Sequence, residues 1–247
     1  MEKNTTGRFI LPLSMALLLA GCATADKHVT AYTPEDYFLY AETMKSAGFR
    51  KRISTAYINN TDQEYKTVDA LKANIEPSET PSVLECDFKE KTCDAYYLGE
   101  DGTKVGSVRY IYRYNDQNMR ISKTGNDIFT EYTYDKGRIT SIVDYAGSEK
   151  TASSEVIKSM EFGYNNENKA THIKGFDTTT ETKSDFDYTL EYDPQGRLIK
   201  INAMLNGEIG SYTVLTYRED GLLASSATYA VTEIGNNLLT YYEFTYE

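Results

Sequence analysis

The side chains that most often carry out chemistry are scarce in this chain, which has two histidines and three cysteines among 247 residues. A hydrolytic triad needs a histidine beside a nucleophile and an orienting acid. His28 lies near the start of the chain, while His172 lies on a predicted strand, and no serine stands in a G-x-S-x-G turn. A strand histidine without such a partner is typical of a surface or packing residue. We therefore expect no catalytic residue in this sequence.

The acidic residues offer a second route to chemistry, because Asp and Glu number 37 against 26 Lys and Arg. A glycosidase uses two carboxylates at a defined separation, but nothing in the sequence singles out two of them. A hydrolase built on acidic residues therefore stays an alternative. The net charge of −11 disfavours a nucleic-acid partner, since phosphate binding needs a basic surface. No nucleotide, cofactor or metal motif occurs, and we expect neither a cofactor nor a metal.

The N-terminus indicates export from the cytoplasm. Lys3 and Arg8 precede a short apolar run that ends in Leu19-Ala20-Gly21-Cys22. This tetrapeptide resembles the lipobox of bacterial lipoproteins, which implies removal of residues 1–21 and acylation of Cys22. An ordinary secretory signal with a chance cysteine is the alternative. The resemblance implies a lipid anchor in the cell envelope, and Ala23 after the cysteine favours the outer membrane.

The remaining cysteines, Cys86 and Cys93, lie in a predicted hairpin. A turn at Lys89-Glu90 places them opposite each other, close enough for a disulfide, which an oxidising compartment preserves. A metal site is the rival interpretation, but it lacks further ligands. We predict a disulfide between Cys86 and Cys93.

Two helices are predicted before the strands, within a small helical region over residues 33–76 that follows a tether over 22–32. The first begins at Thr33-Pro34 and ends at Gly48, after which the basic cluster 50–52 is interpreted as a solvated helix end. The second begins at Thr61, whose spacing to Glu64 is typical of a capping box, and extends to Ile75. The prolines of segment 76–81 end it.

From residue 82 to 247 the sequence predicts consecutive β-hairpins. Short runs rich in Tyr, Ile, Val and Thr alternate with turn residues, and we expect about thirteen strands. A unit of tyrosine, turn and aliphatic strand recurs at Tyr114, Tyr134, Tyr164, Tyr192 and Tyr217, and Tyr246 starts another. Asp or Asn caps each turn, and glycine adopts the positive φ that a side chain resists.

Two units are the clearest, and we assign their turn residues a structural role. These residues are Tyr134, Asp135, Gly137, Arg138, Tyr192, Asp193, Gly196 and Arg197. Each arginine either pairs with the aspartate of its turn or lies on a ring face. The pattern resembles the YD repeat of RHS proteins over residues 108–247, and with the lipobox it is similar to uncharacterised YD-repeat-like envelope lipoproteins. The resemblance implies a strongly curved or barrel-like antiparallel meander.

These features favour a non-catalytic, lipid-anchored envelope protein that acts as a structural or binding scaffold. The 22 tyrosines suit sheet packing first, and a face that binds a protein or glycan partner second. A carrier of an apolar ligand inside a barrel-like cavity is the other candidate.

Overall fold

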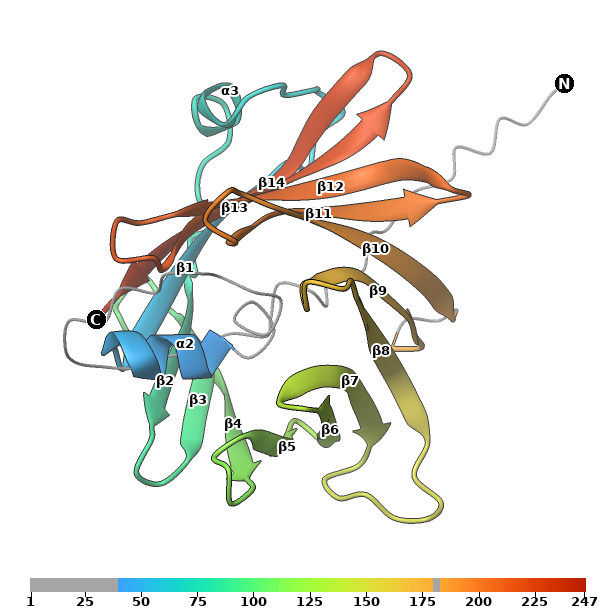
Figure 1. The fold of residues 1–247 in the computed structure, drawn as a ribbon. Coiled ribbons are helices and arrows are strands. Elements are labelled where there is room, and N and C mark those ends of the chain that lie inside the picture. The colour runs from blue at the N-terminus through green and yellow to red at the C-terminus, as the bar shows by residue number, and fades with distance from the viewer. Residues whose placement is uncertain (1–39, 180–182) are drawn as a thin grey trace, which may run out of the picture.

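The computed structural model describes residues 40–179 and 183–247. In this part of the chain, antiparallel strands follow one another in a meander that closes on itself as a barrel (Figure 1). The predicted mainly β, barrel-like meander is therefore confirmed. The predicted signal peptide 1–21, the tether 22–32 and the lipidation site Cys22 lie outside the described residues.

Each strand pairs with its neighbours in the sequence, and the described residues contain fourteen strands. They are β1 (Lys51–Ile58), β2 (Ser82–Asp87), β3 (Thr92–Leu98), β4 (Lys104–Tyr114), β5 (Arg120–Gly125), β6 (Ile128–Asp135), β7 (Arg138–Ala146), β8 (Val156–Tyr164), β9 (Ala170–Asp177), β10 (Ser184–Tyr192), β11 (Leu198–Leu205), β12 (Glu208–Tyr217), β13 (Leu223–Thr232) and β14 (Gly235–Tyr246).

Strand β1 closes the barrel by pairing with β14 on one side and with β2 on the other. This strand corrects the prediction that residues 33–76 are helical, because it lies in the middle of that range. Its β-branched residues favour an extended chain, and the buried Arg52 and Ser54 alternate with outward residues. Arg52, expected at a solvated helix end, is only 1% exposed.

Helix α2 (Tyr40–Ala47) lies inside the ring of strands (Figure 1). It ends at Gly48 as predicted, where the backbone φ is +96° and the amide donates to the carbonyl of Met44. Met44 is fully buried in the main core. The aliphatic residues of this core include Ile139, Ile142, Ile173, Leu190, Leu198, Leu215, Leu222 and Leu223. The chain's own side chains therefore fill this part of the barrel.

Helix α3 (Val68–Lys72) is much shorter than the predicted second helix. Its N-cap is Thr67, whose hydroxyl accepts from the amide of Ala70, whereas Thr61 bonds locally to Asn59. Such local bonds compete with helix formation, which explains the late start. Leu71 is nevertheless buried in a separate cluster that includes residues of β13 and β14. No helix among the described residues has the length and apolar character needed to cross a bilayer.

Candidate functional site

The repeat tyrosines tie adjacent strands together. Five tyrosines at the ends of even-numbered strands donate their hydroxyls to the backbone carbonyl near the start of the preceding strand. The bonds are Tyr134 to Arg120 at 2.9 Å, Tyr164 to Ile139, Tyr192 to Ala170 and Tyr246 to Leu223 at 2.7 Å each, and Tyr217 to Leu198. The hydroxyl of Tyr114 instead donates to Glu42 of α2, at 2.8 Å. The tyrosine of the repeat thus has a structural role.

The turns that follow these tyrosines in the sequence show the aspartate caps and the positive-φ glycines that the sequence predicts. One oxygen of Asp193 accepts from the amides of Gln195 and Arg197, at 3.0 and 2.8 Å. Gly196 has a φ of +82°, a backbone conformation that is strained for a residue with a side chain. In the earlier unit, Gly137 has the same φ of +82° after Lys136 at +50°, so β6 and β7 join through a tight turn.

The two arginines make both contacts that the sequence left as alternatives. Arg138 lies 3.4 Å from Asp135, and its guanidinium lies 5.0 Å from the ring centre of Tyr164. The Nε of Arg197 lies 2.7 Å from Asp193, and its guanidinium lies 5.1 Å from the ring centre of Tyr217. In each case the ring belongs to the next repeat. These turn residues therefore join successive repeats.

The disulfide between Cys86 and Cys93 is present, and the two cysteines face each other in the register of β2 and β3. The turn is longer than predicted, because Asp87 pairs with Thr92 and four residues lie between them. Asp87 caps this turn by accepting from the amides of Lys89 and Glu90. The predicted two-residue turn and the observed four-residue turn give the same strand register, so Cys86 and Cys93 are opposite each other in both.

His172 is a packing residue on β9. It faces Gly163 of β8 in the register, and a Cβ at Gly163 would overlap the imidazole ring. Phe186 faces Gly175, and Tyr110 packs on Gly125, in the same way. Each aromatic ring lies over a glycine of a neighbouring strand, which fills the space that the missing side chain leaves.

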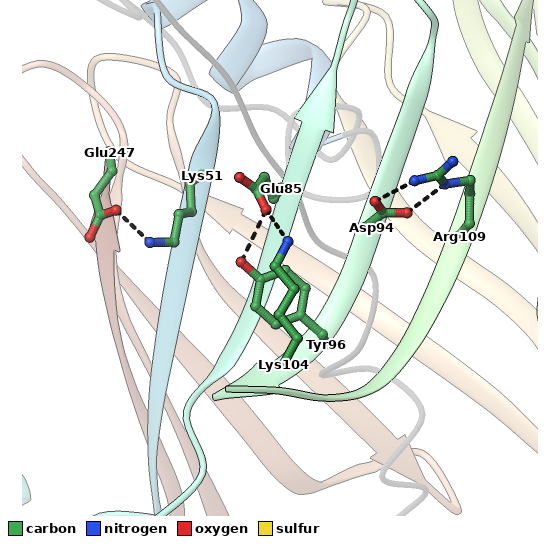
Figure 2. Close-up of polar contacts among 7 residues, drawn as sticks. All are labelled: Lys51, Glu85, Asp94, Tyr96, Lys104, Arg109 and Glu247. Carbon is green, nitrogen blue, oxygen red and sulfur yellow. Dashed lines mark hydrogen bonds and ion pairs between the residues drawn. The ribbon is translucent and has the colours of Figure 1, made fainter. Parts of the chain in front are cut away.

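A charged ridge crosses the outer face of β1 to β4 (Figure 2). Lys51, Glu85, Asp94 and Arg109 face one another in register on these four strands. Lys51 lies 2.5 Å from Glu247, and the Arg109 guanidinium contacts both oxygens of Asp94 at 2.7 Å. We call these five residues, together with Tyr96 and Lys104, the outer ridge.

Glu85 lies at the centre of the outer ridge, where it accepts from Lys104 at 2.6 Å and from the hydroxyl of Tyr96 at 3.1 Å (Figure 2). The bond from Lys104 lowers the pKa of Glu85, and the bond from Arg109 lowers the pKa of Asp94. The same bond to Glu85 raises the pKa of Lys104. These shifts keep Glu85, Asp94 and Lys104 charged through the neutral pH range.

A second charged row lies on the inner face of β5 to β9, in the register Lys123, Thr130, Asp144, Lys158 and Asp177. Lys158 donates to Asp177 at 2.7 Å, and Thr130 donates to Asp144 at 2.6 Å. Burial alone would raise the pKa of Asp177, but the bonds from Lys158 and Thr179 outweigh it and hold the value at about 2.

Sequence reasoning missed the buried charges Arg52, Arg120, Lys123 and Lys158. A lysine or arginine in an alternating strand is normally placed on the solvent side, so no local signal marks these residues. Among the described residues, no cluster of His, Cys, Asp or Glu has a geometry suited to a metal ion.

A comparison with protein-family models finds no match, and a comparison with curated proteins finds none. Among solved structures, the chain is similar to a porin-like protein from Bacteroides uniformis, with 11% identity, a TM-score of 0.45, and coverage of 81% of this chain and 98% of that one. It is also similar to part of the complex TcdB2-TccC3-Cdc42 and of a Tc holotoxin pore from Photorhabdus luminescens. In both, the identity is 13% and the TM-score 0.33, with 76% of this chain and 11% of that chain covered. At these TM-scores the similarity carries no conclusion about activity, ligand or location.

Proposed function

We propose that the protein is a non-catalytic envelope scaffold, anchored to the outer membrane through a lipid on Cys22, which binds a protein partner on the outer face of its barrel. The observation that carries this proposal is the packing of the interior. Met44 of α2 is fully buried among the aliphatic core residues, and the repeat tyrosines tie the strands around it. A barrel whose interior is filled by its own side chains is rigid, and a partner can bind only to its outer face.

The direction of the pKa shifts supports a role without catalysis. A general acid in a glycosidase needs a carboxyl whose pKa is raised towards neutrality. Every described carboxyl with a resolved shift moves the other way, including Glu85, Asp94 and Glu191, because hydrogen bonds from cations or amides favour the charged form. The alternative of an acid-based hydrolase gains no support from these groups.

A carrier of an apolar ligand is the second candidate, and the cavity of about 210 Å³ beside β1 to β4 is the observation in its favour. Ligand pockets usually measure about 300–1,000 Å³ and are mainly apolar. This cavity is smaller, and Arg52, Ser54 and Ser82 contribute to its wall. The scaffold is therefore the better supported function.

The outer ridge is the surface that we propose for the partner. Its charges are fixed, and Ile111, which is 50% exposed, lies two residues beyond Arg109 on the same face of β4. An apolar side chain among permanent charges suits a protein interface, in which apolar contact gives affinity and charge gives specificity.

The experiment places a photocrosslinking amino acid at Ile111 in living cells, with Lys174 on the outer face of β9 as the matched control position. We expect one dominant crosslinked protein from position 111 and none from position 174. Charge reversal by Arg109→Glu should abolish the crosslink, whereas Asp187→Lys, which breaks an ion pair with Lys174, should not.

Two outcomes would contradict the scaffold. Equal crosslinking from both positions, unaffected by Arg109→Glu, would show that the outer ridge binds no partner. Recovery of a stoichiometric apolar molecule with the protein extracted from its native membrane would favour the carrier instead.

A further inference from the structure

Two neighbouring hairpins end in exposed apolar side chains. Among the described residues, eight large hydrophobic side chains are exposed, and four of them lie at the tips of the hairpins β11–β12 and β13–β14. They are Leu205, Ile209, Val231 and Ile234, which are 50%, 37%, 43% and 77% exposed. Single exposed apolar residues are common on protein surfaces, whereas a group of them on two adjacent tips is typical of an interaction surface.

The two tips are adjacent because β12 pairs with β13. That pairing extends as far as Ser211 and Ala230, and each hairpin continues beyond it to its turn. Figure 1 shows both hairpins projecting from the same side of the barrel. These turns join odd-numbered to even-numbered strands, whereas the repeat turns join even-numbered to odd-numbered strands. The exposed tips therefore lie at the end of the barrel opposite the repeat turns.

The turns differ in how well their residues suit them. Asn206 and Gly207, which join β11 to β12, have φ values of +53° and +86°, as expected for a tight hairpin turn. The turn between β13 and β14 instead consists of Glu233 and Ile234. Asn, Asp and Gly are the residues that favour such a turn, and isoleucine is not among them. Turn formation therefore does not account for Ile234, whereas contact with a partner would.

Each tip also carries an acidic side chain. Glu208 and Glu233 are exposed, and within the described part of the chain neither carboxylate has an ion-pair partner. The amine of Lys66 would lie 3.7 Å from a Cβ at Gly235, but this amine pairs with Glu64. Among the described residues, the two tips thus present negative charge without a counter-charge, directly beside apolar side chains.

We propose that these two hairpin tips bind a basic amphipathic segment of another protein. The apolar side chains of that segment pack on the four exposed apolar residues, and its Lys or Arg residues pair with Glu208 and Glu233. This surface is separate from the outer ridge on β1 to β4, so the inference goes beyond the scaffold function.

Charge distinguishes this partner from other occupants of the tips. A segment that binds a membrane surface carries basic residues, which are attracted to anionic lipids, whereas both charges here are negative. A second copy bound tip to tip would place carboxylates against carboxylates, and like charges across an interface repel. A basic protein segment is therefore the occupant that the charges favour.

The first measurement titrates the full chain with a labelled synthetic peptide in which leucine and lysine alternate. A peptide in which leucine and glutamate alternate is the control for apolar contact alone. Fluorescence anisotropy gives the Kd of each peptide. We expect only the lysine peptide to bind, with a Kd that rises as the salt concentration rises.

The charges are tested by Glu208→Lys combined with Glu233→Lys. We expect the Kd of the lysine peptide to rise about tenfold, because two attractions become repulsions. Asp116→Lys combined with Glu219→Lys is the matched control, since it changes the net charge equally at exposed positions of two repeat turns. The control should bind the peptide as the wild type does.

The apolar contact is tested by Ile209→Ser combined with Ile234→Ser. We expect the Kd to rise about tenfold, because two side chains lose the apolar surface that they bury on binding. Ile121→Ser is the control, since Ile121 is 40% exposed on β5, beside a repeat turn. All substituted side chains are exposed, so an unchanged melting temperature shows that each variant is folded.

In cells, a photocrosslinking amino acid at position 234 identifies the natural occupant. We expect mass spectrometry of the adduct to give a segment of another protein that combines Lys or Arg with apolar residues. The adduct should be lost when Glu208→Lys and Glu233→Lys are introduced. The same amino acid at position 121 should give no such adduct.

The proposal is overturned if position 234 gives no adduct, or an adduct with lipid, with a second copy of the chain or with the chain's own N-terminal residues. Equal binding of the lysine peptide by the wild type and by the variant with Glu208→Lys and Glu233→Lys would also overturn it. Arg109→Glu should leave the adduct at position 234 unchanged. Failure of this inference and failure of the outer ridge are therefore distinguishable.

Discussion

At the scale of single residues, Lys123 is a buried lysine whose surroundings disfavour its charged form. Its pKa is lowered to about 8, chiefly by burial and also by the nearby cations Arg120 and Lys158, while Asp144 acts in the opposite direction. The other lysines with shifted pKa values, such as Lys51 and Lys104, are raised by their carboxylate partners. Lys123 is thus held by the structure around it and not by an ion pair.

This burial makes the stability depend on pH in a defined window. An unfolded lysine has a pKa of about 10.4, so between about pH 8 and pH 10.4 the unfolded chain binds the proton that the folded chain has released. Stability due to this group therefore rises with pH across that window. Below it the full penalty of roughly 3 kcal/mol applies. Lys123→Met should be more stable than the wild type at pH 7, and the gain should disappear near pH 10.5.

Urea denaturation of both proteins from pH 7 to pH 10.5 measures this difference. The exposed Lys174, paired with Asp187, provides the control substitution Lys174→Met, which should give a difference that changes little with pH. A gain for Lys123→Met that stays constant over the whole range would show that Lys123 is not depressed in the folded state.

The contact between Gly163 and His172 gives a second prediction at this scale. Gly163→Ala would force the imidazole from its place, with an expected loss of about 1–3 kcal/mol of stability. When His172 is replaced by Ala as well, the new methyl group has room. The double variant should therefore lose less stability than the sum of the two single variants, as measured by chemical denaturation. Simple additivity would show that the ring does not pack on the glycine.

At the scale of elements, a tyrosine at the end of β6, β8, β10, β12 and β14 bonds each of these strands to the preceding one. Tyr192→Phe removes the bond to the carbonyl of Ala170 and leaves that buried acceptor with fewer partners. We expect a loss of about 1 kcal/mol, the usual net value of such a bond. Tyr97→Phe is the matched control, since Tyr97 is 40% exposed. Equal effects of the two substitutions on the urea midpoint would contradict a specific role for the repeat tyrosine.

Those elements that local chemistry determines were predictable. The turns around Gly137 and Gly196 follow from residues that tolerate positive φ, and the hairpin of Cys86 and Cys93 follows from alternation along two short strands. Strand β1 was not predictable, because its pairing partner β14 lies at the other end of the chain. A short segment between two helical patterns carries no signal of a contact so distant in sequence.

The inner charges escaped prediction for a related reason. From the sequence alone, Lys123 and Lys158 are expected to point outward. The register across β5 to β9 instead places them on the inner face, with Met160 and Ile142. The same limit holds for the cavity wall, where Ser54 and Ser82 meet only after β1 has joined β2. Closure of the barrel thus creates both the buried charges and this cavity.

At the scale of the whole molecule, the outer face decides how the barrel relates to a membrane. Ion pairs recur around it at widely separated places. They include Lys51–Glu247, Lys104–Glu85, Lys150–Glu131, Lys174–Asp187 and Lys200–Glu191. A basic side chain on the lipid face of a membrane barrel costs about 2–4 kcal/mol at the bilayer midplane. A surface with this pattern is suited to water.

We propose that a lipid on Cys22 anchors the protein, and Cys22→Ser tests this for the molecule as a whole. A serine cannot form the thioether, so the variant should incorporate no fatty-acid analogue, and it should leave the membrane fraction for the soluble fraction of the envelope. The wild type should be labelled and should resist extraction with high salt, because several acyl chains hold it. Arg109→Glu is the matched control, since it changes the outer ridge without touching the anchor. If the Cys22→Ser protein remained in membranes after an alkaline wash, the barrel itself would be the membrane-bound part, and the charged outer face would have to be shielded by a partner.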